Sequence, residues 1–242
     1  MGTPMTPFDY RQSYRRKLPH IQTPGSTIFT TFRLFGSVPV SVLNEYRNER
    51  ISKVRQASER SDSEADVEFY RKWFLKIDAI LDKAKDGPTW LKRPDLRAIV
   101  FEKMLEGDVE HYRLDAFSIM SNHVHALFHP NLREDGLIKM RPGEIPPLER
   151  DSTLAKIMQK WKGVSARECN RLLGRSGQFW DHESFDREVR GVGGFDRALR
   201  YTLRNPVKAR LARRPADWAG NYVSDRLLEE AWVRDVWETS TD

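Results

Sequence analysis

The sequence has almost no cysteine: Cys169 is the only one among 242 residues. A single thiol excludes an internal disulfide and a cysteine-rich zinc site, and it fits a reducing cytoplasm, which is the expected location. The chain also lacks any apolar run that approaches the roughly 20 residues of a membrane span. The basic N-terminal segment has no apolar core behind it, so we expect neither a secretory signal nor a membrane partner.

Positive charge is in slight excess, with 41 Lys and Arg against 35 Asp and Glu and a net charge of +6. Such a balance favours polyanionic partners, nucleic acid first, although many soluble proteins are merely basic. Hydrophobic residues make up 39% of the chain, which is enough for a globular fold. The length suits one generous domain, predicted over residues 1–223, with an amphipathic helix or tail over 224–242.

Residues 114–129 are predicted to form one nearly continuous apolar strand that carries His123 and His125. Because side chains alternate along a strand, both histidines should project from one face, with Val124 and Ala126 on the other. Two neighbouring imidazoles on one face can bind a divalent metal through their ring nitrogens. Two hydrogen-bonded sheet histidines would look the same, so the motif alone does not decide.

The other predicted elements surround this strand and indicate an α/β sandwich of the α+β class, with a central antiparallel sheet and helices mostly on one face. A helical insertion of about residues 41–85 follows the first strand. The pattern predicts strands at 27–34 and 178–190 and helices at 67–81, 95–105, 153–173 and 195–204, the last interrupted at Asn205-Pro206 and followed by a short helical turn.

Two basic segments are candidates for contact with phosphates. Arg15 and Arg16 lie in an irregular N-terminal segment, and the helix at 153–173 carries positive side chains on its polar side. A solvated face explains either segment equally well. The candidate nucleic-acid-binding residues are Arg15, Arg16, Lys156, Lys160, Lys162 and Arg167.

Five stretches resemble one known family, the REP-associated tyrosine transposases, which are single-tyrosine HUH enzymes. Residues 117–125 (FSIMSNHVH) resemble the family's metal-binding strand, and residues 199–209 (LRYTLRNPVKA) resemble its nucleophile helix. Residues 30–39, 154–170 and 174–180 (GRSGQFW) are similar to its opening strand, the helix that follows the metal-binding strand and a turn of the family. Ser121 replaces a usual proline, and Arg210 replaces a usual glycine, so we expect the helix to be capped differently.

The resemblance implies a ferredoxin-like β-α-β-β-α-β fold and a complete catalytic set. Tyr201 would be the nucleophile, and His123, His125 and Asn205 would hold Mg²⁺ or Mn²⁺; histidine ligation alone would equally allow zinc. Tyr201 and Asn205 are four residues apart and therefore share a helix face. Without the histidine strand, a core aromatic and a helix-end cap would be the simpler interpretation.

The expected function is a metal-dependent endonuclease and strand transferase (a transposase) for single-stranded DNA, forming a 5′-phosphotyrosine intermediate and recognising hairpins such as repetitive extragenic palindromes. The alternatives are a domesticated HUH-fold protein that binds hairpin DNA or RNA without cutting it, and a nickase resembling replication initiators. The sequence leaves open whether the protein is a monomer or a homodimer.

Overall fold

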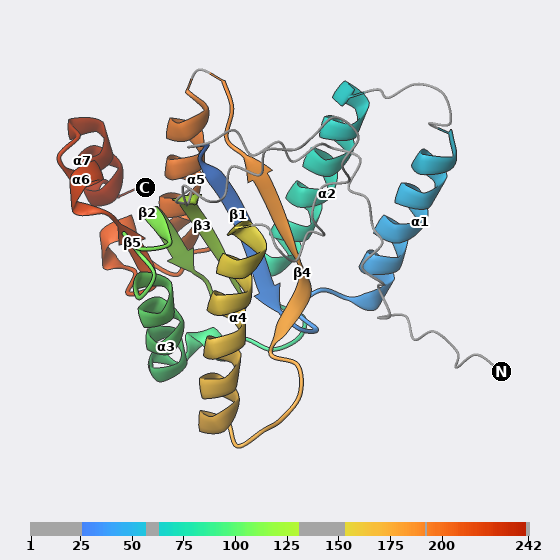
Figure 1. Ribbon diagram of the computed structural model, residues 1–242, viewed down its shortest axis with the longest axis horizontal. Coiled ribbons are helices and arrows are strands. Elements are labelled where there is room, and N and C mark those ends of the chain that lie inside the picture. The colour runs from blue at the N-terminus through green and yellow to red at the C-terminus, as the bar shows by residue number, and fades with distance from the viewer. Residues whose placement is uncertain (1–25, 57–62, 131–152, 192, 241–242) are drawn as a thin grey trace, which may run out of the picture.

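The computed structural model describes residues 26–56, 63–130, 153–191 and 193–240; the loop predicted at 131–150 lies outside them. Within this part of the chain, five strands form one antiparallel sheet in the order β4-β1-β3-β2-β5 (Figure 1). The strands are β1 (Ile28–Leu34), β2 (Tyr112–Ile119), β3 (His123–Pro130), β4 (Trp180–Glu188) and β5 (Asn221–Val223).

The helices complete the predicted ferredoxin-like order β1-α3-β2-β3-α4-β4, which the strand arrangement confirms. Helices α1 and α2 occupy the predicted insertion after β1. None of the described helices is both long and apolar enough to cross a membrane. The helices are α1 (Val40–Gln56), α2 (Ser63–Lys83), α3 (Pro94–Leu105), α4 (Thr153–Leu172), α5 (Gly194–Lys208), α6 (Asp225–Leu228) and α7 (Ala231–Glu238).

Helices cover both faces of the sheet, so the prediction that they lie mostly on one face is wrong. On the first face, α3 and α4 pack over Phe32, Phe128 and the other inward residues of the main core (Figure 1). On the second face, α5, α6 and α7 pack over Phe29 and Leu127, and α2 joins them through its own aromatic contacts. The central strands are buried on both sides, so each face of the sheet has a cover of helices.

The stretch predicted as one strand over 114–129 is instead a hairpin of β2 and β3. The chain reverses at residues 120–122, where the Met120 N–H donates to the His123 carbonyl over 2.8 Å. Serine and asparagine favour such a turn, but the apolar residues on both sides of it hid the reversal. The predicted alternation of β3 is confirmed, because Val124 and Ala126 enter the main core while both histidines lie on the opposite face.

Helix α5 continues through Pro206 to Lys208, although an interruption was predicted at Asn205-Pro206. The proline lies in the last turn of the helix, where its fixed φ suits the helix and its missing N–H removes one hydrogen bond. In contrast, the amphipathic stretch predicted after residue 224 divides into α6 and α7.

The end of α5 is capped in the left-handed conformation that the usual glycine would adopt, so the expectation of a different cap is wrong. Arg210 has a φ of 58°. Its N–H donates to the Val207 carbonyl, and the Leu211 N–H donates to the Pro206 carbonyl. These two bonds form a Schellman motif with arginine at the position that favours glycine.

Replacing this arginine should therefore stabilise the protein. A left-handed residue with a Cβ costs roughly 1–2 kcal/mol, part of which is offset because glycine makes the unfolded chain more flexible. We expect Arg210→Gly to raise the free energy of unfolding by about 1 kcal/mol in urea titrations. The matched variant Ala209→Gly changes a residue with a φ of −79° and should lower it. Destabilisation by Arg210→Gly would contradict the strain assigned to Arg210.

Candidate metal centre and tyrosine

The two histidines of β3 are fully buried and face each other. Their Nε2 atoms lie 3.0 Å apart, and each side chain has 0% exposure. Ring nitrogens bind divalent metals at about 2.0–2.1 Å, so two atoms at this separation can share one ion. The two rings meet edge-on, with an interplanar angle of 83°.

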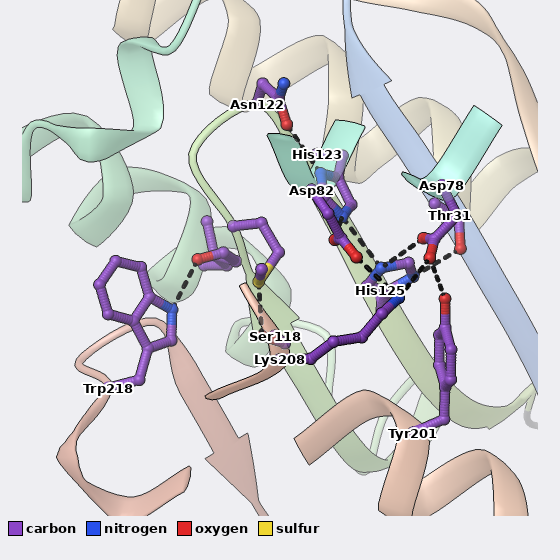
Figure 2. A network of polar contacts seen from close by, with 12 residues as sticks. Thr31, Asp78, Asp82, Ser118, Asn122, His123, His125, Tyr201, Lys208 and Trp218 are labelled. Carbon is purple, nitrogen blue, oxygen red and sulfur yellow. Dashed lines mark hydrogen bonds and ion pairs between the residues drawn. The ribbon is translucent and has the colours of Figure 1, made fainter. Parts of the chain in front are cut away.

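The outer nitrogen of each histidine has its own partner, which fixes the ring. Asn122 Oδ1 lies 2.7 Å from His123 Nδ1, and Thr31 Oγ1 lies 2.7 Å from His125 Nδ1 (Figure 2). Thr31 stands opposite His125 in the register of β1 and β3, so the sheet itself sets this contact. Metal-binding histidines are usually oriented in this way by a second hydrogen bond.

A carboxylate from the inserted helix α2 completes a three-residue cluster. Asp78 is 2% exposed, and its Oδ1 lies 3.3 Å from His125 Nε2. One ligand atom from each of Asp78, His123 and His125 lies within 4.8 Å of the other two. The ring of Phe74, one turn earlier on α2, packs edge-on against Phe29 of β1 and so holds α2 on this face.

Sequence reasoning missed Asp78, since it carried no functional role into residues 41–80. A signal was present, because Asp78 and Asp82 are four residues apart and thus share one face of the predicted amphipathic helix.

Tyr201 lies in the same cluster, on α5. Its hydroxyl donates a hydrogen bond to Asp78 Oδ2, so the two oxygens of one carboxylate face the histidines and the phenol respectively. The Tyr201 ring centroid is 5.4 Å from that of His125 and 5.8 Å from that of Phe29. Burial, and then the negative charge of Asp78, raise the pKa of Tyr201 well above its usual value, so the phenol is protonated.

Lys208, two turns along α5 from Tyr201, balances the acidic side of the cluster. Its Nζ lies 2.7 Å from Asp82 Oδ2 and 3.3 Å from Asp78 Oδ2 (Figure 2). Burial raises the pKa of Asp82, and the neighbouring charge of Asp78 raises it further. The ammonium therefore offsets two closely spaced carboxylates that burial would otherwise disfavour.

Asn205, predicted as a metal ligand, is 1% exposed and lies one turn after Tyr201 on α5. Among the described residues, neither Oδ1 nor Nδ2 of its amide has a hydrogen-bond partner. A buried amide without partners is costly, and an additional group bound at the site would relieve that cost.

The protonation states suit a cation. Burial, and then the charge of His125, lower the pKa of His123 well below its usual value, so its imidazole is neutral and able to ligate. Burial alone would raise the pKa of Asp78, but its interactions with His125, His123 and Tyr201 outweigh burial and hold that pKa well below the usual range. Two imidazoles and a carboxylate whose ligand atoms lie within 4.8 Å of one another form a donor set suited to a divalent metal ion.

The predicted basic helix α4 lies on the other face of the sheet, opposite the histidines (Figure 1). Lys156, Lys160 and Arg167 are exposed there. Lys162 is half-buried and donates to the His182 carbonyl over 3.1 Å, and burial lowers its pKa to about 8. Arg15 and Arg16 lie outside the described residues.

The chain is similar in structure to a solved protein. No family model matches the chain, and no curated protein matches it in sequence. One solved structure that matches is described as the structure of the REP-associated tyrosine transposase bound to a REP hairpin; the alignment covers 90% of this chain and 89% of that one, at 11% identity and a TM-score of 0.45. This is the family that the sequence motifs resemble.

The ligand set can be tested by direct metal binding. We expect Mn²⁺ to stabilise the folded protein, by about 2.7 kcal/mol at a concentration 100 times its Kd. Asp78→Asn should weaken binding about tenfold or more in calorimetric titrations, because it removes a charged ligand. Asp82→Asn is the matched control: it removes the same charge one turn away, where Asp82 Oδ1 is 3.8 Å from His123 Nε2, and should change the Kd far less. A larger effect at Asp82 would move the carboxylate ligand to that residue.

The neutral state of His123 predicts a pH dependence of stability in the metal-free protein. Because the pKa of His123 is lower in the folded than in the unfolded chain, the free energy of unfolding should be highest above about pH 6.5 and fall as the pH decreases below it. One such group contributes a slope of at most about 1.4 kcal/mol per pH unit. Urea unfolding with EDTA from pH 7 to pH 5 should show a shallower slope for His123→Gln. Equal slopes would mean that His123 is protonated in the folded state.

Proposed function

We propose that this protein is a metal-dependent endonuclease and strand transferase for single-stranded DNA, with Tyr201 as the nucleophile. The observation that carries the proposal is the hydrogen bond from the Tyr201 hydroxyl to Asp78, whose other oxygen faces the paired histidines. A phenol held beside a candidate metal centre is the arrangement required for attack on a phosphodiester.

In the first step, Tyr201 Oη attacks the phosphorus. The new Tyr–O–P bond forms as the P–O3′ bond breaks, which gives a 5′-phosphotyrosine and a strand with a free 3′-hydroxyl. The phenolic proton already lies on the hydrogen bond to Asp78 Oδ2, so Asp78 is placed to receive it and to return it to the leaving 3′-oxygen. Attack by the 3′-hydroxyl of another strand reverses the sequence and joins the two strands without an external energy source.

His123, His125, Asp78 and Asn205 would hold the cation, for which Mg²⁺ or Mn²⁺ is proposed. Once bound there, the cation would polarise the phosphate and offset the charge of Asp78 that raises the pKa of Tyr201. The burial of both histidines and their fixed rings mean that the ligands need little rearrangement on binding.

The proposed substrate is a single strand next to a hairpin of the repetitive extragenic palindrome kind. The choice of substrate is supported by the sequence motifs, since residues 117–125 and 199–209 resemble the metal-binding strand and the nucleophile helix of the transposase family.

Loss of the phenol should abolish cleavage and spare binding. Incubated with labelled hairpin DNA and Mn²⁺, the protein should give a covalent protein–DNA band on a denaturing gel, which EDTA removes. Tyr201→Phe should give no band while its Kd for the hairpin changes less than about threefold, because one hydroxyl is lost and no charge is altered. Tyr222→Phe is the control: Tyr222 stacks on Phe117 over the α3 face, so the band should persist.

The same assay separates the alternatives. Tight hairpin binding without a band under any metal would favour a domesticated binding protein. A band without transfer to a second strand that offers a 3′-hydroxyl would favour a nickase. A covalent band with Tyr201→Phe would remove Tyr201 from the mechanism.

A further inference from the structure

Positive charge is concentrated on two helices, and charge alone does not decide which of them meets DNA. Helix α4 carries five basic residues and one acidic residue. Helix α5 carries Arg197, Arg200, Arg204 and Lys208, with Asp196 as its one acidic residue. The two helices lie on opposite faces of the sheet (Figure 1). Stacked layers are about 10 Å apart, so a strand held on α4 would be separated from Tyr201 by the sheet.

The arginines of α5 follow one side of the helix. Arg197, Arg200 and Arg204 are spaced by three and four residues and therefore share a face. Arg200 directly precedes Tyr201 in the chain, and Arg204 directly precedes Asn205. The row runs along the helix that carries the proposed nucleophile.

A fourth arginine extends the row across the sheet edge. Arg187 pairs with Phe29 in the register of β4 and β1, and its guanidinium carbon lies 5.3 Å from the centroid of the Phe29 ring. The same ring contacts both Tyr201 and His125.

Three of these guanidinium groups have no anionic partner within the described residues. Arg187 and Arg200 have ring contacts only, Arg200 with Trp232 at 4.9 Å, and Arg204 Nε is buried without a hydrogen-bond partner. Other arginines of the described residues do have an acidic partner; Arg190, for example, lies 2.5 Å from Glu188. Guanidinium groups left unpaired on one surface are suited to phosphate oxygens.

We propose that Arg187, Arg197, Arg200 and Arg204 form the track on which the sugar-phosphate backbone of single-stranded DNA lies as it passes Tyr201, and that the basic residues of α4 are not part of this contact. This inference rests on the proposed function and assigns its DNA-binding surface to α5 and the adjoining edge strand. It places the phosphates on the same face of the sheet as His123 and His125.

Salt dependence of binding tests the assignment, with an oligothymidylate of about 20 nucleotides as the probe. Each lost phosphate contact lowers the slope of log K against log salt by about 0.7 for a single strand, so the triple variant Arg187→Gln/Arg200→Gln/Arg204→Gln should lose about 2 from the slope. Its Kd at low salt should rise about tenfold or more. Thermal unfolding of each variant checks that the fold is kept.

The comparison variant is Lys156→Gln/Lys160→Gln/Arg167→Gln, which removes the same three charges from the opposite face. The slope for this variant should equal that of the wild type, because its lost charges lie on the face away from Tyr201. The two variants have the same net charge, so a difference between their slopes reports where the charge was lost. An equal loss of slope in both variants, or a larger loss in the α4 variant, overturns the track on α5.

The proposed function has a separate readout, which is the covalent band formed by Tyr201. If the band forms and the α4 variant is the one that loses slope, the track is wrong and the function stands. If the wild type neither binds the oligonucleotide nor forms the band, both are wrong.

Discussion

A carboxylate that is 2% exposed must be compensated by other charges or donors, and Asp78 is compensated by three side chains from two other elements. His125 on β3, Tyr201 on α5 and Lys208 at the end of α5 all approach it. The inserted helix, the central sheet and the helix with the tyrosine are thus joined through one charged group. Removal of this carboxylate would take an anionic partner away from Lys208 and from the buried His125.

The sheet divides the molecule into a face that stabilises and a face that carries the polar site. Strands β1 and β3 turn Phe32, Val124 and Phe128 towards α3 and α4, where they form the main core. The alternate residues, among them Thr31, His123 and His125, face α2 and α5. Side chains carried by a central strand are held more rigidly than side chains on loops, so the two histidines would need little ordering if an ion were bound between them.

Local rules were enough to predict the parts of the site that lie close together in sequence. The period of a strand places His123 and His125 on one face, and the period of a helix places Tyr201 and Asn205 on another. The ferredoxin-like topology was predicted from the resemblance of five stretches to a known family, and not from periodicity. Asp78 could not be predicted in this way, because its role depends on a long-range contact between an inserted helix and β3.

Two expectations about local structure, the single strand over 114–129 and the cap of α5, were wrong for definite reasons. The hairpin at residues 120–122 was hidden because apolar residues such as Ile119 and Val124 lie on both sides of the turn, so that no change of pattern marks it. The left-handed Arg210 shows that a backbone conformation can persist where the residue that favours it is missing.

Asp78 belongs to the inserted helix α2, so the site can lose this carboxylate without any change in the sheet. Helix α2 packs mainly with α1, in a small cluster of its own that includes Tyr46, Trp73 and Leu81. A helix held by such a satellite cluster opens at a lower free energy than the central strands do. Each opening would withdraw the carboxylate while β3 keeps its histidines in place. The lifetime of the assembled centre is therefore set by the docking of α2. Mild denaturant should separate Asp78 from the histidines while the sheet still protects its amides from exchange with solvent.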